Sequence, residues 1–313
     1  MTTTPMIHLG VATEVGPLTV FPVWTDAPRA ARALRTSLPK GTKVGELESG
    51  SSVERLQLHH PGPKAFLLPG GTIFGGGWQH RALVHGVVVE QPVDLDLDVR
   101  CVEQLRWNGD GDQRVHQRRA PIGVQGALRG IRADHGDQTR YESGRAPHPT
   151  RDELADQDEV WRRVQRYSPV LGASASLSLV EITDVLDDGL DDLLGRVPLL
   201  DGQRGVLIGV AGHPAVLEVF DHPRTLAGQI RAILGGVLAD AAMAPTRTTP
   251  GYRARAFAHR VSRRDLTQVS PAGTGVLAET RDDLAAIDGV TTGDDRLVHL
   301  SALNVRHDLV AAA

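Results

Sequence analysis

The chain has 313 residues, of which 41% are hydrophobic and 23% are charged, and its formal net charge at pH 7 is −4. These values are those of an ordinary globular protein, and they exclude a global electrostatic attraction to nucleic acid or to anionic lipid. One cysteine excludes an internal disulfide framework and a cysteine-based zinc cluster within one chain.

The N-terminal stretch MTTTPMIHLG has neither the basic start nor the apolar core of a signal peptide. No apolar run approaches the roughly 20 residues that a membrane-spanning helix needs. We therefore expect a cytoplasmic protein that binds neither nucleic acid nor membrane. These totals do not predict an oligomeric state.

The first 68 residues predict mostly sheet. Apolar residues alternate with small or polar ones over 7–24, around a turn at Gly16-Pro17, which indicates one or two strands. Asp26 can cap a helix over 28–37 that carries Pro28 in its first turn. Three short strands are also expected, at 44–47, 53–58 and 65–68.

The stretch from 66 to 107 holds the most unusual residues, including a cluster of glycines at 70–77. An apolar strand is predicted over 83–90, where Gly86 indicates a bulge or a close backbone approach. Aliphatic residues then alternate with aspartates over 93–100. This period of two puts the aspartates on the solvent face of a strand, rather than in a calcium loop.

Composition shifts at 108–149, where apolar residues are sparse and glycine and arginine are frequent. We expect this polar excursion to lack regular structure. After it, Thr150 and Glu153 form a capping box that opens a helix over 151–166.

The C-terminal half predicts two helices, over 183–197 and 223–242. In the second helix, Gly235 and Gly236 indicate a close contact between helix and sheet. Strands at 206–210 and 215–220 flank a turn sequence and predict a hairpin. Alternating residues predict three further strands, at 252–259, 276–279 and 297–300.

These elements predict an α+β fold, a mainly antiparallel β-sheet with about four helices. We expect a single domain over 1–313, with the excursion at 108–149 lying over the sheet.

Two short polar segments could carry chemistry. Glu103 and Arg106 are three residues apart at the end of a predicted strand, with Trp107 beside them. A carboxylate next to a ring can have its pKa raised toward that of a general base, whereas an arginine would oppose that shift or bind an anion. Gln79, His80 and Arg81 follow the glycine turn and can present an amide, an imidazole and a guanidinium to a ligand. A structural Glu–Arg pair and an exposed loop are the alternatives.

No motif in the sequence indicates a cofactor or a metal. A phosphate-binding P-loop, a dinucleotide glycine pattern and an HExxH helix are all missing from it. His59 and His60 are neighbours on a predicted strand and point to opposite faces, which disfavours ligation of one ion. We therefore expect no cofactor and no metal site.

Several segments together resemble one protein family. The sequences FLLPGG at 66–71, WQHR at 78–81, CVEQLRW at 101–107 and QDEVW at 157–161 match, in this order, the pattern of the ARG and rhodanese-phosphatase-superfamily-associated protein domain, the ARPP family. The resemblance spans about 7–242, and CVEQLRW together with WQHR is its most specific part.

The resemblance implies a set of site residues, which are Gln79, Arg81, Glu103, Arg106, Trp107, Gln157 and Trp161. The family's name associates it with ADP-ribosylglycohydrolases and rhodanese-like phosphatases, which implies a link to ADP-ribose or phosphate metabolism. This chain departs from the pattern at three positions. Gly71 replaces an acidic residue, Trp78 replaces a lysine, and His80 replaces an asparagine.

The leading functional hypothesis is binding of an anionic small molecule such as ADP-ribose or a related nucleotide. In it, Gln79, Arg81, Glu103, Arg106 and Trp107 build the pocket: the two arginines hold the anion, Trp107 stacks on the ligand, and Glu103 is a hydrogen-bond acceptor or a base. Gln157 and Trp161 are further candidate ligand-binding residues, which the resemblance implies. A hydrolase with Glu103 as general base is one alternative, and a non-catalytic structural or interaction module is another. The departures at Gly71 and Trp78 leave open whether the protein is an enzyme.

Overall fold

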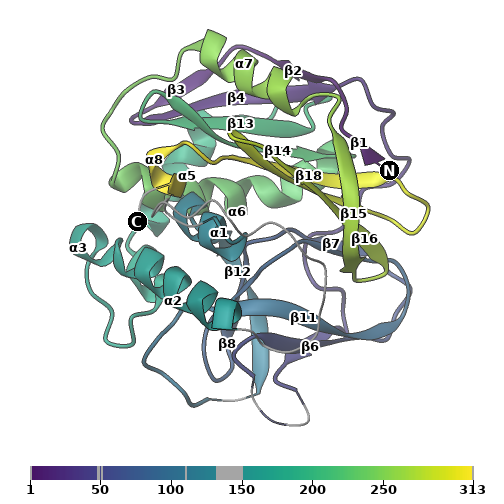
Figure 1. The fold of residues 1–313 in the computed structure, drawn as a ribbon, viewed down its shortest axis with the longest axis vertical. Helices are drawn as coiled ribbons and strands as arrows, with labels where there is room; N and C mark the ends of the chain where they lie inside the picture. The colour runs from purple at the N-terminus through teal and green to yellow at the C-terminus, as the bar shows by residue number, and fades with distance from the viewer. Residues whose placement is uncertain (1, 48–49, 51, 110, 132–150, 312–313) are drawn as a thin grey trace.

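Most of the strands belong to two antiparallel assemblies that pack against each other, a large sheet and a closed barrel (Figure 1). The computed structural model describes residues 2–47, 50, 52–109, 111–131 and 151–311, with the backbone alone described for 151–156. The proposed capping box at Thr150 and Glu153 therefore lies outside the described residues and side chains.

The large sheet has ten strands in the order β1-β15-β16-β17-β18-β14-β13-β4-β2, with β3 beside β4. It is built from both ends of the chain. Its strands are β1 (Thr2–Thr3), β2 (Ile7–Leu9), β3 (Thr13–Val15), β4 (Leu18–Thr25), β13 (Gly205–Val210), β14 (His213–Phe220), β15 (Asp265–Ala272), β16 (Gly275–Arg281), β17 (Ala285–Thr291) and β18 (Leu297–Asn304).

The middle of the chain forms the barrel, in the order β11-β6-β5-β12-β8-β9. Its strands are β5 (Lys43–Gly45), β6 (Arg55–His60), β8 (Thr72–Gly76), β9 (Arg81–Leu83), β11 (Val93–Cys101) and β12 (Asp112–Arg119). A separate pair, β7 (Phe66–Leu68) and β10 (Val87–Val89), connects the two assemblies, because Val88 O accepts a hydrogen bond from Thr274 N at 2.8 Å, between β15 and β16.

Helices lie between the two assemblies and on their outer sides. They are α1 (Ile122–Leu128), α2 (Arg151–Gln165), α3 (Ser168–Leu171), α4 (Leu179–Asp184), α5 (Asp187–Arg196), α6 (Pro223–Ala242), α7 (Gly251–Val261) and α8 (Asp308–Ala311). Helix α7 covers the outer face of the large sheet, and α6 lies between that sheet and β12 of the barrel (Figure 1). No helix in the described part of the chain is long and apolar enough to cross a membrane.

Both faces of the large sheet are therefore buried in apolar cores. On β4, Val20 packs toward α6 together with Ile208 and Leu234, whereas its neighbour Phe21 packs toward α7 together with Phe257. Gly235 and Gly236 let α6 approach the barrel, since a Cβ at Gly236 would lie 2.7 Å from Arg119 O. The predicted close contact at this glycine pair is thus confirmed, although its partner is a barrel strand.

The predicted α+β class and the antiparallel pairing are confirmed, but the expectation of about four helices is too low. The hairpin β13–β14 and the helix α6 are confirmed, and α6 has the predicted bounds. The predicted helix over 183–197 is two helices, α4 and α5, which are separated at Val185 and Leu186. The predicted strand over 83–90 is interrupted between Leu83 and Val87, where the chain leaves the barrel.

Two other predictions were wrong because backbone groups and side chains have different partners from those expected. No helix forms over 28–37, since Asp26 Oδ1 accepts a hydrogen bond from Met6 N at 2.9 Å and Ala30 N donates to Asp221 O at 3.2 Å. Residues 252–259 lie in α7 rather than in a strand, since Ala254, Phe257 and Ala258 bury one helical face.

The excursion at 108–149 contains regular structure in its described part, namely β12 and α1. Strand β12 escaped prediction because three of its buried residues are polar, Gln113, Arg118 and Arg119. Such a strand shows no apolar alternation, although it is central to the barrel.

Candidate functional site

Five of the residues singled out in the sequence lie together at one end of the barrel. Gln79 and Arg81 come from the β8–β9 connection and from β9, and Glu103, Arg106 and Trp107 follow β11. Strand β9 pairs with the end of β11, so that Arg81 lies opposite Cys101. This pairing brings WQHR and CVEQLRW together.

The carboxylate of Glu103 is fully buried and accepts hydrogen bonds from Arg106 and from the His80 backbone. Arg106 donates to Oε1 from Nε at 3.0 Å and to Oε2 from Nη2 at 2.7 Å, and His80 N donates to Oε2 at 2.9 Å. Burial alone would raise the pKa of Glu103, but the hydrogen bonds from Arg106 and from the His80 backbone outweigh it and lower that pKa. A general base needs a raised pKa and access to its substrate, and Glu103 has neither in this arrangement.

Every guanidinium nitrogen of Arg106 bonds to its own chain. Besides Glu103, Nη1 donates to Gly77 O at 2.7 Å and to Asn108 O at 2.8 Å, and Nη2 donates to Gly76 O at 3.2 Å. Gly77 has a φ of 55°, and a Cβ there would lie 1.9 Å from Gln113 Nε2, so any other residue would force the buried Gln113 side chain to move. The Glu103–Arg106 pair therefore fastens the β8–β9 turn to the segment after β11.

Arg81 is fully buried against the aromatic residues of the same cluster. Its Nη1 donates to Gln79 Oε1 at 3.1 Å and its Nη2 to Ser52 O at 3.2 Å, and its guanidinium carbon lies 5.6 Å from the centroid of the Trp107 ring. Trp78 packs edge to face on Trp107 with the ring centroids 6.0 Å apart. Trp78 thus supplies an aromatic wall beside Trp107.

The other two predicted site residues lie on α2. Gln157 is buried, and its amide bonds to the backbone of Cys101. Trp161 is half-buried, and its Nε1 has no hydrogen-bond partner among the described residues. The structure thus gives Gln157 a role in holding β11, and it does not bring Trp161 into the cluster.

His80 has hydroxyl and carboxylate neighbours, but not in the order of a catalytic triad. Ser178 Oγ lies 2.8 Å from His80 Nδ1, and Glu103 Oε2 lies 3.6 Å from the same nitrogen. A triad needs the hydroxyl and the carboxylate on opposite ring nitrogens. The contacts of Glu103, Arg106 and Arg81 therefore favour the structural alternative for this cluster.

Two hollows that described residues line lie away from this cluster. The first is a cleft of about 470 Å³ between the barrel and the large sheet, lined by His85, Arg100, Arg129, Glu279 and Asp288 among others. Glu279 and Asp288 are directly paired across β16 and β17. Arg129 Nε lies 3.0 Å from Asp288 Oδ2, and His85 Nδ1 lies 3.3 Å from Glu279 Oε1.

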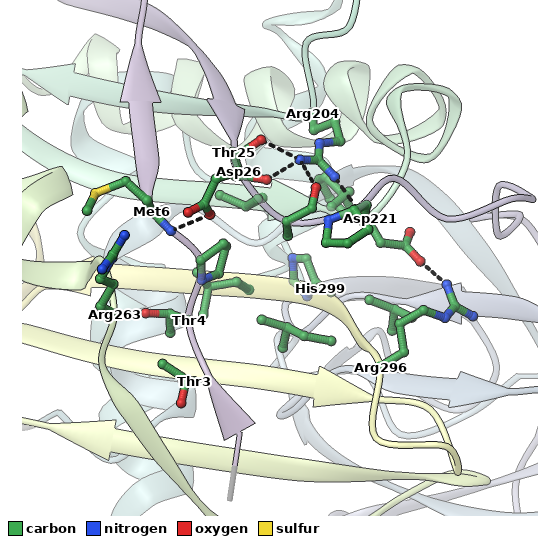
Figure 2. Close-up of a pocket in the computed structure, with 18 residues that line it drawn as sticks. Thr3, Thr4, Met6, Thr25, Asp26, Arg204, Asp221, Arg263, Arg296 and His299 are labelled. Atoms are coloured by element: carbon green, nitrogen blue, oxygen red, sulfur yellow. Dashed lines mark hydrogen bonds and ion pairs between the residues drawn. The ribbon is translucent and has the colours of Figure 1, made fainter.

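The second hollow is a cavity of about 540 Å³ at one end of the large sheet (Figure 2). Its wall is largely apolar, with Phe220, Val298 and Leu300, and three arginines lie around it, which are Arg204, Arg263 and Arg296. Figure 2 shows Arg263 on one side and Arg204 and Arg296 on the other. Burial raises the pKa of Asp221 in this cavity to about 6, against the opposing effect of Arg296.

A buried polar network connects the surroundings of the two hollows. Arg129 Nη2 donates to Ser301 Oγ at 2.7 Å, and Ser301 Oγ donates to Glu218 Oε1 at 2.8 Å. Glu218 Oε2 lies 2.7 Å from His299 Nε2 and 3.0 Å from Arg119 Nη1. Burial would raise the pKa of Glu218, but Arg119 and His299 hold it far below its usual range.

The family model of the ARG and Rhodanese-Phosphatase-superfamily-associated Protein domain matches residues 6–303. The chain belongs to this family. No curated protein and no solved structure matches it. The ARPP match extends beyond the 7–242 inferred from short segments, and it includes all strands of the large sheet except β1, with Asn304 alone of β18 beyond it.

Sequence reasoning missed the residues of both hollows of the ARPP domain. His85, Glu279 and Asp288 meet only because β16 and β17 pair in one register and the β9–β10 connection lies against them. Arg263 lies between the predicted strands at 252–259 and 276–279, and nothing in the local sequence indicates its left-handed backbone, which the fold imposes.

Proposed function

We propose that this ARPP domain binds a small anionic molecule in the cavity at the end of the large sheet. Phosphate-bearing nucleotides such as ADP-ribose are the first class to test, because the family's name associates it with enzymes of ADP-ribose and phosphate chemistry. An apolar cavity of this size with a few convergent polar groups is the usual form of a small-molecule site. The free guanidinium of Arg263 at its edge carries the proposal.

Arg263 is held in a conformation that points to a function. Its φ of 54° lies in the left-handed region, which is uncommon for a residue other than glycine, asparagine or aspartate. Its backbone N–H donates to Thr4 O at 3.2 Å, whereas its guanidinium makes no hydrogen bond or ion pair with the described residues. A fixed backbone with an uncommitted guanidinium suits recognition of a phosphate or a carboxylate.

Arg204 adds positive charge from the opposite side. Its Nη2 donates to Thr25 O at 2.7 Å and to Ala27 O at 2.7 Å, and these acceptors are neutral. Burial lowers the pKa of Arg204, against the raising effects of Asp221 and Asp26. Because no carboxylate among the described residues forms an ion pair with Arg204, its charge is available to attract an anion.

Asp221 offers a complementary acceptor. It forms an ion pair with Arg296 through Oδ2, while its buried Oδ1 has no hydrogen-bond partner among the described residues. A hydroxyl or an amino group of a ligand could donate to Oδ1. A molecule with a phosphate near Arg263 and sugar hydroxyls near Asp221 would satisfy both groups.

The barrel-end cluster supports anion binding less well. Every guanidinium nitrogen of Arg106 is bonded, and Arg81 is fully buried with Nη1 bonded to Gln79 and Nη2 bonded to Ser52, so that its Nε alone lacks a partner among the described residues. An anion there would have to replace internal hydrogen bonds, which costs about as much as it gains.

Thermal shift and calorimetry with inorganic phosphate, AMP, ADP and ADP-ribose test the proposal. At least one nucleotide is expected to bind saturably and to raise the melting temperature. Arg263→Asn removes the guanidinium and keeps a residue that tolerates the left-handed backbone, so we expect affinity to fall about 10-fold or more without loss of stability.

Arg255→Ala is the matched control, because Arg255 is exposed on the neighbouring helix α7 and lies outside the cavity. It is expected to leave affinity unchanged. A flat response across the panel, or equal affinity in the Arg263→Asn and wild-type proteins, would overturn the proposal.

A further inference from the structure

Two carboxylates occupy directly paired positions on the large sheet. Glu279 on β16 lies opposite Asp288 on β17, so both side chains share one face of the sheet. Like charges in such positions repel each other. Burial and the neighbouring charge of Asp288 raise the pKa of Glu279, whereas Arg129 and His85 outweigh burial and lower the pKa of Asp288.

An imidazole from the other assembly completes this pair. His85 lies in the β9–β10 connection, and its Nδ1 is 3.3 Å from Glu279 Oε1 and 3.8 Å from Asp288 Oδ2. The nearest ligand atoms of the three residues all lie within 4.8 Å of one another. Three ligands with bonds of about 2.1 Å to one ion lie about 3.0–3.6 Å from one another, so side-chain movements of about 1 Å would bring these atoms to ligating distances.

We propose that His85, Glu279 and Asp288 bind a divalent transition-metal cation. Three protein ligands leave further coordination positions open toward the cleft. The imidazole favours iron, nickel, copper or zinc over calcium and magnesium, which prefer oxygen ligands, and the two carboxylates also suit manganese. This site is separate from the proposed anion cavity and does not depend on it.

The surroundings of the three ligands are those of an oriented metal site. Arg129 Nε lies 3.0 Å from Asp288 Oδ2, and Arg129 Nη2 donates to Ser301 Oγ at 2.7 Å. Hydrogen-bonded neighbours of this kind fix the direction of a ligating carboxylate. The Asp288 side chain is 15% exposed and that of Glu279 is 34% exposed, so an ion can reach both from the cleft.

Arg129 Nη1 is a buried donor without a partner among the described residues, and it indicates that an anionic group binds beside the metal. The Arg129 side chain is 6% exposed, it lines the cleft, and its Nη1 has no hydrogen-bond partner among the described residues. His85 Nδ1 is likewise buried without a hydrogen bond of acceptable geometry. The metal satisfies His85, and an anionic oxygen bound to that metal can accept from Arg129 Nη1.

The test is titration of the chelator-treated full chain with Mn²⁺ and Zn²⁺. Calorimetry and the loss of the free Mn²⁺ electron paramagnetic resonance signal are expected to give one site per chain. His85→Ala and Glu279→Gln are each expected to weaken metal binding about 100-fold or more. This loss exceeds the 10- to 100-fold loss that follows removal of a residue that only hydrogen-bonds to a metal ligand. Circular dichroism checks that each variant is folded. If His85→Ala does not fold, the test rests on Glu279→Gln, because this substitution is isosteric and its site is partly exposed.

His59→Ala is the matched control. His59 Nδ1 lies 2.5 Å from Asp94 Oδ1 in an exposed pair that has a single carboxylate, so its loss should not change metal affinity. Inorganic phosphate is expected to tighten Mn²⁺ binding several-fold, and no effect of phosphate would remove the assigned role of Arg129. If neither cation binds saturably, or if both ligand variants bind as the wild type does, these residues form only an ion cluster and the metal site is refuted.

Discussion

Gln157 pairs with the backbone of Cys101 through both atoms of its side-chain amide. Its Oε1 accepts from Cys101 N at 2.9 Å, and its Nε2 donates to Cys101 O at 2.9 Å. The side chain thus takes the place of a neighbouring strand beside the end of β11. Helix α2 holds the barrel in register at the residue two positions before Glu103.

Gln157→Ala is expected to destabilise the protein by several kcal/mol, because two buried peptide groups lose their partners at about 1–3 kcal/mol each. Urea denaturation measures the change. Gln165→Ala is the control, since Gln165 lies on the same helix and its amide bonds to Gln104 in an exposed position. Its effect should stay within about 0.5 kcal/mol. Equal effects of the two substitutions would contradict this role of Gln157.

The Cys101 thiol should be unreactive in the folded protein. Burial raises its pKa to about 11, against the lowering effect of Arg81, and the thiolate is the reactive form. At pH 8 we expect a thiol reagent such as Ellman's reagent to label Cys101 only through unfolding or local opening. The rate should therefore increase in Gln157→Ala and not in Gln165→Ala. Rapid labelling of the native wild type would refute this expectation.

Glu103→Gln is expected to cost about 3–5 kcal/mol at pH 7, because it leaves Arg106 with an uncompensated charge. Since the pKa of Glu103 is lowered in the folded state, its contribution is present above the unfolded pKa of about 4.3 and is lost as pH falls through the folded pKa. The wild type and the variant should therefore converge in stability toward pH 3. Unfolding free energies at pH 7 and pH 3 measure this. An equal gap at both values would show that the carboxylate charge is not responsible.

Asp240 should produce the opposite pH dependence. It is fully buried, accepts from Ile122 N at 2.6 Å and from Tyr167 Oη at 2.7 Å, and burial raises its pKa to about 6. Its contribution is present below the unfolded pKa of about 3.9 and is lost as pH rises through 6, by about 3 kcal/mol in all. Asp240→Asn should remove this part of the slope between pH 4 and 6. An unchanged slope would place the titration elsewhere, for example at Asp221.

Gly236→Ala and Gly195→Ala should have opposite effects on stability. A Cβ at Gly236 would lie 2.7 Å from Arg119 O, so we expect a loss of about 1–3 kcal/mol from overpacking. Gly195 lies in the last turn of α5 with nothing within 4 Å of such a Cβ, so alanine there should add up to about 1 kcal/mol. Thermal denaturation of both variants checks the signs, and stabilisation by Gly236→Ala would mean that α6 is not in tight contact with β12.

Local sequence signals predicted the elements whose residues follow one period and whose ends carry turn residues. The hairpin β13–β14 turns at Ala211 and Gly212, which both have positive φ, and α6 begins at Pro223. Strand β12 could not be found in this way, because Gln113, Arg118 and Arg119 occupy its buried positions. Its inward side chains are satisfied by distant partners, and no local pattern encodes those.

The same limit applies to the site. The sequence predicted that WQHR and CVEQLRW meet, and they do, because β9 pairs with the end of β11. It did not predict that Arg106 donates a hydrogen bond to Gly77 and that Arg81 donates to Gln79 and Ser52. Whether a polar residue is free for a ligand depends on carbonyl groups placed by the fold.

The strand order of the large sheet determines when this sheet can be completed during synthesis of the chain. Strand β4 leaves the ribosome before the barrel strands do, and Leu18 to Val23 are all buried in the final fold. Its inner neighbour β13 is synthesised only after the whole barrel, and the sheet is completed only by β18. Until then the nascent chain carries an unpaired apolar edge, the kind of surface that aggregates or recruits chaperones. If translation stopped after the barrel, the released fragment would therefore contain the barrel and the exposed apolar strand β4.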